Sequence, residues 1–232
     1  MLTEREIIEK FGEDEDFFVC AKYALTHGAK IIYAEEDGLL LYYQGIYNLF
    51  GTSGNGLKNA LSLVDKAECF VCSSEEEGDA VKEKFCFEHK KPCYQVNYKK
   101  PCGIKIPENT EVKELLPTDE NVDFVTKTYT LGFSRETIKS LMTDFEFYAT
   151  FTGGELSGYI GRHDEGSIGI LEIMPNFRRM GLGAFLVDYS VKKVREKGEP
   201  AYCHIFTGNE GSLKMHLKMG FTPCEKLVWW VN

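Results

Sequence analysis

The sequence lacks any long apolar segment. None of its apolar runs approaches the ~20 residues that an α-helix needs to cross a bilayer. The N-terminus, MLTEREIIEK, does not have the pattern of a signal peptide. We therefore expect a cytoplasmic protein that has no membrane as a partner.

The sequence also lacks a block of positive charge. The 232 residues carry 27 Lys and Arg against 36 Asp and Glu, a formal net charge of −9. The densest basic cluster, in residues 192–197, falls late in an expected helix, where positive charge suits the helix dipole. A surface for nucleic acid is therefore not expected.

The eight cysteines lack the spacing of a zinc site. Cys69 and Cys72 form a Cys-x-x-Cys pair, but they lie in an apolar run that is typical of a strand. Positions three apart on a strand point to opposite faces, and no second pair appears. In a cytoplasmic protein disulfides are rare, so we expect free, mostly buried thiols and no metal.

Residues 101–110, PCGIKIPENT, have the composition of a linker and divide the chain into halves of 1–110 and 111–232. Each half shows two helical stretches, then strands, then a Gly-rich turn that leads into a helix, and then a further strand. This shared order indicates a pseudo-repeat, although the two halves have no evident sequence identity.

The turn in the second half is the most informative segment of the chain. The apolar run Ile168–Met174 predicts a buried strand that Pro175 ends, and Arg178–Gly183 leads into an amphipathic helix. A helix N-terminus carries unpaired N–H groups and a partial positive charge, and glycines let the backbone approach a pyrophosphate. The turn could equally be a strand-to-helix connection that happens to contain two glycines.

Two better-known phosphate motifs are absent from this turn. No Gly-Lys-Ser/Thr follows, which excludes a P-loop. The dinucleotide fingerprint also fails, because Leu186 stands where a third small residue belongs.

Arg178, Gly181 and Gly183 match the Arg/Gln-x-x-Gly-x-Gly/Ala motif of the GNAT superfamily, which binds acyl-CoA. The second half of the family pattern is a strand, then Asn, then a helix that ends in Gly-Phe. Residues 201–206, Asn209 and Gly220-Phe221 fill those places in the same order. The second half of the chain, about residues 111–232, therefore resembles a GNAT domain.

The resemblance implies an α+β fold of two tandem GNAT-like domains, each a mixed central sheet flanked by helices. Residues 111–232 would form the catalytic, acyl-CoA-binding domain, and residues 1–110 a degenerate one. The Gly-rich turn of the first half, Gly51–Gly56, lacks the Arg or Gln of the motif. It is interpreted as a tight turn of a structural domain.

By the same resemblance, the co-substrate is acetyl-CoA or another acyl-CoA, with no metal. The pantetheine would insert beside the strand that precedes the turn, pair with its backbone and contact the Asn of the second half-motif. The residues implied in binding are Ile173, Met174, Arg178, Arg179, Met180, Gly181, Leu182, Gly183, Ala184, Asn209 and Ser212.

Three residues are the main candidates for proton transfer, and two others are weaker ones. Glu172 lies inside an apolar strand, where a carboxylate is costly unless it faces a cleft, so it is the leading candidate for the base. His204, on the strand 201–206, is its rival, and His163 and Glu165 are weaker candidates. His216 stands where the family often has a Tyr that protonates the leaving thiolate, and an imidazole can also donate a proton. Solvent exposure of Glu172 and simple packing of His216 are the alternatives.

Within the superfamily, the second half is most similar to the glycine N-acyltransferase branch. The segments that carry this likeness are Tyr202–Ile205, Asn209-Glu210 and Trp229-Trp230. That branch has a Glu proposed as base at the start of the strand before the turn, where this chain has Ser167. Glycine is therefore not implied as the acceptor.

These features predict an N-acyltransferase that moves an acetyl group from acetyl-CoA to a primary amine of a small molecule or amino acid. A non-catalytic acyl-CoA-binding regulatory module is one alternative, and a peptide or protein N-acetyltransferase is another. The protein would be a monomer or a homodimer.

Overall fold

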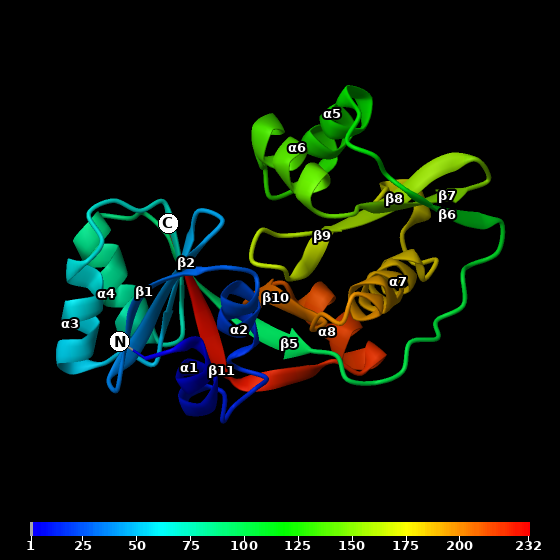
Figure 1. Cartoon of the computed structure of the whole chain (residues 1–232). Coiled ribbons are helices and arrows are strands. Elements are labelled where there is room, and N and C mark those ends of the chain that lie inside the picture. The colour runs from blue at the N-terminus through cyan, green and yellow to red at the C-terminus, as the bar shows by residue number, and fades with distance from the viewer. Residues whose placement is uncertain (1) are drawn as a thin grey trace. The chain divides into compact units, whose positions relative to one another are not determined.

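The computed structural model describes residues 2–232 and divides into two compact units. Unit 1 contains the chain up to Asn97 together with His204–Leu217 and Phe221–Asn232, and unit 2 contains Tyr98–Cys203 and Lys218–Gly220 (Figure 1). The predicted halves, 1–110 and 111–232, do not coincide with these units, because the C-terminal part of the chain returns to the sheet of unit 1.

Unit 1 is built on a mixed sheet of seven strands in the order β1-β2-β3-β4-β11-β5-β10. Its helices, in chain order, are α1 (Glu4–Phe11), α2 (Val19–Thr26), α3 (Gly54–Ser62), α4 (Glu75–Phe85) and most of α8 (Glu210–Met219). Its strands are β1 (Lys30–Glu35), β2 (Gly38–Tyr43), β3 (Ile46–Phe50), β4 (Cys69–Cys72), β5 (Lys90–Asn97), β10 (Tyr202–Phe206) and β11 (Thr222–Val231).

Strand β11 lies inside this sheet, between β4 and β5, and runs antiparallel to both. Trp229 is opposite Cys72 on one side and Pro92 on the other. The segment TPCEKLVWWV does not alternate cleanly between polar and apolar residues, so its own pattern is a weak signal for a strand. Pairing with β4 and β5 on both sides therefore decides that this segment is a strand.

Strands β3 and β4 of unit 1 are parallel and are joined by α3. Their ladder is continuous from the pair Ile46–Cys69 to the pair Leu49–Cys72. Parallel strands that pair along this whole length leave no space for an inserted chain between them. The side chains of α3, α4 and these strands form one apolar core, and α1 and α2 cover a second one that includes Phe18 and Leu39.

Unit 2 contains a four-stranded sheet in the order β6-β7-β8-β9, in which each neighbouring pair is antiparallel. The predicted second mixed sheet is therefore not present in this unit. Its strands are β6 (Thr110–Glu114), β7 (Tyr148–Thr152), β8 (Glu155–Arg162) and β9 (Ile168–Ile173). Its helices are α5 (Asp119–Thr128), α6 (Arg135–Asp144), the short 3-10 helix η1 (Pro175–Phe177) and α7 (Leu182–Glu196).

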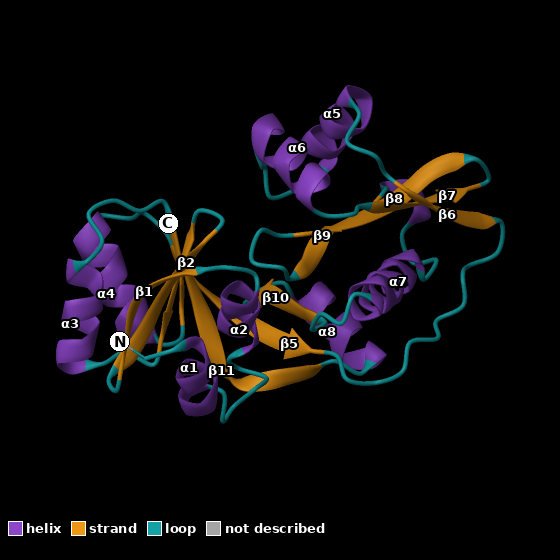
Figure 2. Ribbon diagram, viewed as in Figure 1, coloured by secondary structure: helices purple, strands orange, loops and turns teal. Residues whose placement is uncertain are grey.

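The core of unit 2 explains where the helices lie. Val122 and Ile138, from α5 and α6, pack with Phe147 and Tyr159. Helix α7 packs against β7, β8 and β9, and Figure 2 shows it on the other side of the sheet from α5 and α6. The sheet of unit 2 is thus covered on both faces, as an α+β protein requires.

All eight cysteines lie among the described residues and are free thiols; four are buried, three are half-buried and Cys86 is exposed, so the expectation that most are buried holds for only half of them. No helix within residues 2–232 is both long enough and apolar enough to pass through a membrane.

Candidate functional site

The Gly-rich turn that the sequence singled out lies at the end of β9. The chain passes from β9 through η1 to Gly181, which is the N-cap of α7 and has a φ of 83°. A left-handed backbone of this kind favours glycine. Among the described residues, no side chain caps this helix terminus. The first N–H groups of α7 have no intrahelical partner, so they are free to bind an anion.

Arg178, just before the helix, contacts the end of β9 twice. Its Nε donates to the carbonyl oxygen of Ile173 over 3.1 Å, and its Nη2 lies 3.3 Å from Oε1 of Glu172. The Arg178 side chain is 55% exposed, whereas that of Glu172 is only 12% exposed. The structure therefore brings together two residues that the sequence predicted for different tasks, anion binding and proton transfer.

Met174, the other residue predicted to pair with pantetheine, already has backbone partners. Its N–H donates to the carbonyl oxygen of Ser157 over 3.0 Å, and its own carbonyl oxygen accepts from Phe177 over 2.9 Å. Strand β9 is the edge strand of its sheet. Ile173 is therefore the better placed of the two for a backbone contact with a ligand.

Strand β9 contains a bulge that the sequence analysis missed. Ile170 has a φ of 49°, and the register against β8 shifts between Tyr159 and Gly161. A β-branched residue rarely adopts this conformation, so its own propensity argues against the bulge. Gly169, the residue before it, was the available signal, because an isolated glycine within a strand often marks such a place. The bulge bends β9 and so changes the direction of its last residues, where Glu172 lies.

Two tyrosines line the face of the sheet that Glu172 occupies. Tyr159 is directly opposite Glu172 on β8, so the two side chains share a face. The hydroxyl of Tyr159 lies 2.9 Å from that of Thr128. Burial, together with the nearby Glu172 carboxylate, raises the pKa of Tyr159 to about 12. Burial also raises the pKa of Tyr129, with Tyr159, Glu165 and Glu172 adding to the effect. Both phenols thus keep their protons at neutral pH.

The turn between β8 and β9 holds the weaker candidates. Glu165 is 1% exposed and accepts a hydrogen bond from the hydroxyl of Ser167. Burial raises the pKa of Glu165 to about 7 and lowers that of His163 to about 4. The imidazole of His163 packs directly over Gly169. His163 is thus neutral at pH 7. Ser167, which stands where the glycine N-acyltransferase branch has a Glu, binds the carboxylate of Glu165.

Glu165 should make stability depend on pH. Its pKa in the folded state, about 7, exceeds the ordinary 4.5, so its contribution is present at low pH and is lost as pH rises through 7. Between pH 6 and pH 8 we expect wild type to lose about 1 kcal/mol relative to Glu165→Gln. Urea unfolding of both proteins at the two pH values measures this. His163 titrates in both proteins, so the difference isolates Glu165, and parallel pH profiles would refute the effect.

His204 lies in unit 1, inside a hydrogen-bond network. The indole N–H of Trp230 donates to its Nδ1 over 3.2 Å, and its Nε2 is 2.9 Å from Oε1 of Gln95. Gln95 in turn donates to the carbonyl oxygen of Phe17 over 2.9 Å. Because an indole can only donate, the network assigns the proton of neutral His204 to Nε2. Both nitrogens have partners, so His204 would have to break a hydrogen bond to act as a base.

Asn209, Ser212 and His216 form a local group in unit 1. Asn209 Oδ1 accepts from the backbone N–H of Ser212 over 3.2 Å, and Nδ1 of His216 lies 2.8 Å from the carbonyl oxygen of Ser212. The His216 ring is 5% exposed and packs edge-on against Phe221. Because a carbonyl only accepts, Nδ1 carries the proton, and burial lowers the pKa of His216. A neutral imidazole is a poor proton donor. The role of His216 as the donor to the leaving thiolate therefore stays a prediction.

Comparisons with known proteins place this geometry in a fold family. Residues 147–230 match the model of the family described as FR47-like protein. A Drosophila protein of known structure superimposes with a TM-score of 0.75 at 13% identity, over 99% of this chain and 96% of that one. A GCN5-related N-acetyltransferase (GNAT) from Kribbella flavida gives a TM-score of 0.61 at 10% identity, over 92% and 94%.

A GCN5-related N-acetyltransferase-like protein from Streptococcus suis gives a TM-score of 0.57 at 13% identity, over 98% and 97% of the two chains. The chain has the GNAT fold. These matches show the fold alone. The tandem organisation and the glycine N-acyltransferase branch stay predictions.

The Gly-rich turn in unit 1, Gly51–Gly56, is bound by a carboxylate from elsewhere in unit 1, that of Glu77 on α4. The carboxylate of Glu77, which is fully buried, accepts from the N–H and hydroxyl of Thr52 at 2.7 and 2.8 Å and from those of Ser73 at 2.6 and 2.9 Å. It also accepts from the N–H of Ser74 at 3.0 Å. An internal anion therefore occupies the donors that a phosphate would need here, in agreement with a structural turn.

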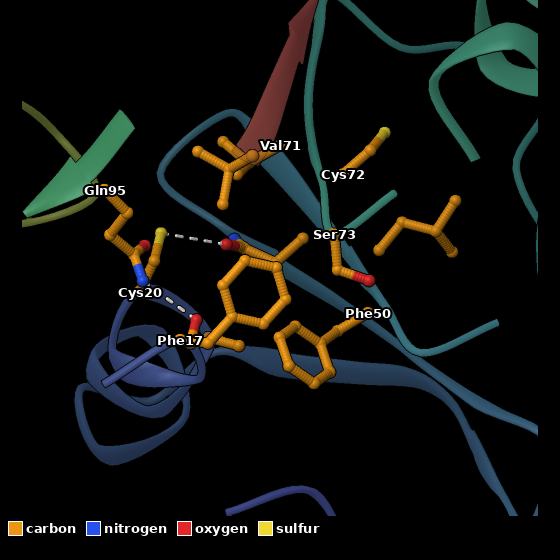
Figure 3. A pocket seen from close by; sticks show the side chains of 11 residues that line it. Phe17, Cys20, Phe50, Val71, Cys72, Ser73 and Gln95 are labelled. Carbon is orange, nitrogen blue, oxygen red and sulfur yellow. Dashed lines mark hydrogen bonds between the residues drawn. The ribbon is translucent and has the colours of Figure 1, made fainter. Parts of the chain in front are cut away.

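Unit 1 also contains a pocket of about 240 Å³, including space open to solvent, beside α2 and the sheet (Figure 3). Asn48 is 3% exposed, and its Oδ1 accepts from Cys20 Sγ at 3.3 Å. No lining residue is charged, and none is among the site residues predicted for the GNAT motif. Among the described residues, no three His, Cys, Asp or Glu side chains are grouped to hold a metal ion.

Proposed function

We propose that this chain is an acyl-CoA-dependent N-acyltransferase that moves an acetyl group from acetyl-CoA to a primary amine of a small molecule or amino acid. The observation that carries the proposal is the turn at the end of β9. It combines an uncapped helix N-terminus, a left-handed Gly181 and Arg178 with a carboxylate, Glu172, on the adjoining strand. The GNAT fold supports the same chemistry at the level of its family.

In this proposal the pyrophosphate of CoA binds the backbone of residues 178–184 and the guanidinium of Arg178. The carbonyl oxygen of Ile173, on the edge strand β9, pairs with the pantetheine arm. Acetyl-CoA supplies the activated acyl group as a thioester.

The chemical step needs a proton acceptor and a proton donor. The amine nitrogen attacks the thioester carbonyl carbon, the new C–N bond forms, and the C–S bond breaks to release the thiolate of CoA. Glu172 takes the proton that the amine loses. The thiolate takes its proton from water, since a thiol with a pKa near 8.5 leaves readily.

Within this class of acceptors, the surroundings of Glu172 favour a small-molecule amine over an amino acid, because an amino acid brings a carboxylate of its own. Arg178 is already paired with Glu172, and Arg162 is ion-paired with Glu199 over 2.5 Å. The negative charges of Glu165 and Glu172 add to the effect of burial in raising the pKa of Tyr129. A cationic amine is attracted to such a region, whereas the carboxylate of glycine is repelled.

A non-catalytic acyl-CoA-binding module is the second candidate. The observation that favours it is that both nitrogens of His204 are engaged and that Glu172 has an ion-pair partner. The two functions differ in one measurement. An enzyme releases the free thiol of CoA from acetyl-CoA when amines are added, and a binding module does not.

Replacing Gly181 by Asp should weaken CoA binding at least tenfold, which corresponds to about 1.4 kcal/mol. The substitution strains a left-handed position and sets a negative charge against the phosphates. Calorimetric titration with CoA measures the change. Gly198→Asp is a matched control, because Gly198 has a φ of 76° at the other end of α7 and also has open space around it. Equal CoA affinities in the two variants would contradict the assignment of the site.

A further inference from the structure

Arg178 makes its two polar contacts with the groups that the proposed reaction needs. One is the carboxylate of Glu172, the candidate base, at 3.3 Å, and the other is the carbonyl oxygen of Ile173, the candidate partner of pantetheine, at 3.1 Å. In this arrangement the base is neutralised by an ion pair and the carbonyl is covered by the guanidinium. A protein ready for the acyl transfer needs both groups free.

We propose that Arg178 is a shared residue that exchanges partners, so that binding of the CoA pyrophosphate draws it from Glu172 and Ile173 and thereby frees the base and the edge of β9. The inference rests on the proposed function, because it needs CoA as the competing ligand. It adds a coupling that the function alone does not contain. In the absence of CoA, Glu172 is held in an ion pair, and it becomes available for the amine only once CoA is bound.

The energetics allow this exchange. Arg178 is 55% exposed although Glu172 is only 12% exposed, so water screens the guanidinium side of the pair and weakens it. A pyrophosphate carries more negative charge than one carboxylate, and it also binds the free N–H groups at the start of α7. The guanidinium presents its donors in a fixed planar fork, so turning toward a phosphate removes them from the Ile173 carbonyl and the Glu172 carboxylate together.

Thermodynamic linkage turns the exchange into a measurable quantity. If CoA must displace Glu172 from Arg178, then Glu172 lowers the affinity for CoA. Glu172→Gln should therefore bind CoA about two- to fivefold more tightly than wild type, in line with the strength of an ion pair of which one partner is exposed. Removing the carboxylate would also relieve simple repulsion of the phosphates, so this variant alone does not isolate the exchange.

A double-mutant cycle separates the two effects. CoA affinity is measured by calorimetry for wild type, Glu172→Gln, Arg178→Gln and the double variant. Partner exchange predicts that Glu172→Gln tightens binding only when Arg178 is present, whereas repulsion tightens it in both backgrounds. Glu155→Gln is the control for net charge, because Glu155 is an exposed carboxylate at the start of β8. Circular dichroism and thermal melting confirm that each variant is folded.

The outcomes are distinct for the inference and for the function. Tighter binding in Glu172→Gln that disappears in the Arg178→Gln background supports partner exchange. An unchanged affinity in Glu172→Gln, or an equal gain in both backgrounds, overturns the exchange and leaves the proposed function standing. Absence of CoA binding by wild type overturns both.

Discussion

Replacing Glu172 by Gln is expected to lower turnover by about 10²-fold or more. The two side chains have nearly the same shape, so the packing beside Tyr159 and the fold of β9 are retained. What the amide loses is the ability to take a proton from the attacking amine. The variant should still bind CoA at least as tightly as wild type, so that the effect falls on kcat.

The measurement is release of the CoA thiol from saturating acetyl-CoA with a panel of primary amines that includes glycine, an aliphatic diamine and an aromatic amine. His204→Gln is the matched comparison, because it tests the rival base by the same assay. Full activity in Glu172→Gln, together with an inactive His204→Gln, would transfer the role to His204. Loss of activity in neither variant would leave the amine to lose its proton to solvent.

Replacing Glu77 by Gln is expected to lower the free energy of unfolding by about 2–4 kcal/mol. The carboxylate of Glu77 accepts from three backbone N–H groups, those of Thr52, Ser73 and Ser74, and from two hydroxyls. In the amide, one oxygen becomes an NH₂ group that can only donate. It would face other donors inside a fully buried site, where unpaired polar groups are costly.

Urea unfolding at constant pH measures this loss. Glu76→Gln is the control, because Glu76 is the adjacent residue on α4 but is exposed. That change should stay within about 0.5 kcal/mol of wild type, as surface substitutions usually do. A loss in Glu77→Gln no larger than in the control would show that the anion in the turn is dispensable.

The part of the candidate site that the sequence could predict is the part that is local. Gly181 and Arg178 lie within four residues of each other, and their motif describes a strand, a turn and a helix that follow directly in the chain. The structure places β9, Gly181 and α7 at the predicted positions. Short-range sterics and the missing hydrogen bonds of a helix terminus are properties that neighbouring residues specify by themselves.

The features that the sequence could not predict depend on distant residues. The place of β11 between β4 and β5 is decided by pairing across more than 120 residues of chain, which no local pattern encodes. The bulge at Ile170 goes against the preference of that residue. The ion pair of Arg178 with Glu172 depends on the path of η1, and a motif defined by spacing does not describe side-chain partners.

The boundary between the units shows the same limitation. Most of the linker predicted at residues 101–110 is irregular chain between β5 and β6, although Thr110 already begins β6. The composition of a linker shows where elements stop, but it does not show where later elements return. Residues 204–217 and 221–232 belong to unit 1, although they follow all of the sheet of unit 2 in the chain.

The position of β11 has a consequence for how the chain is made. Translation proceeds from the N-terminus, so β4 and β5 emerge from the ribosome long before residues 222–231 that separate them in the finished sheet. Until then each of these strands presents an unpaired edge, which is the kind of surface that recruits other chains. The sheet of unit 1 closes only after synthesis has passed through unit 2, so this unit is the first to begin in the chain and the last to be completed.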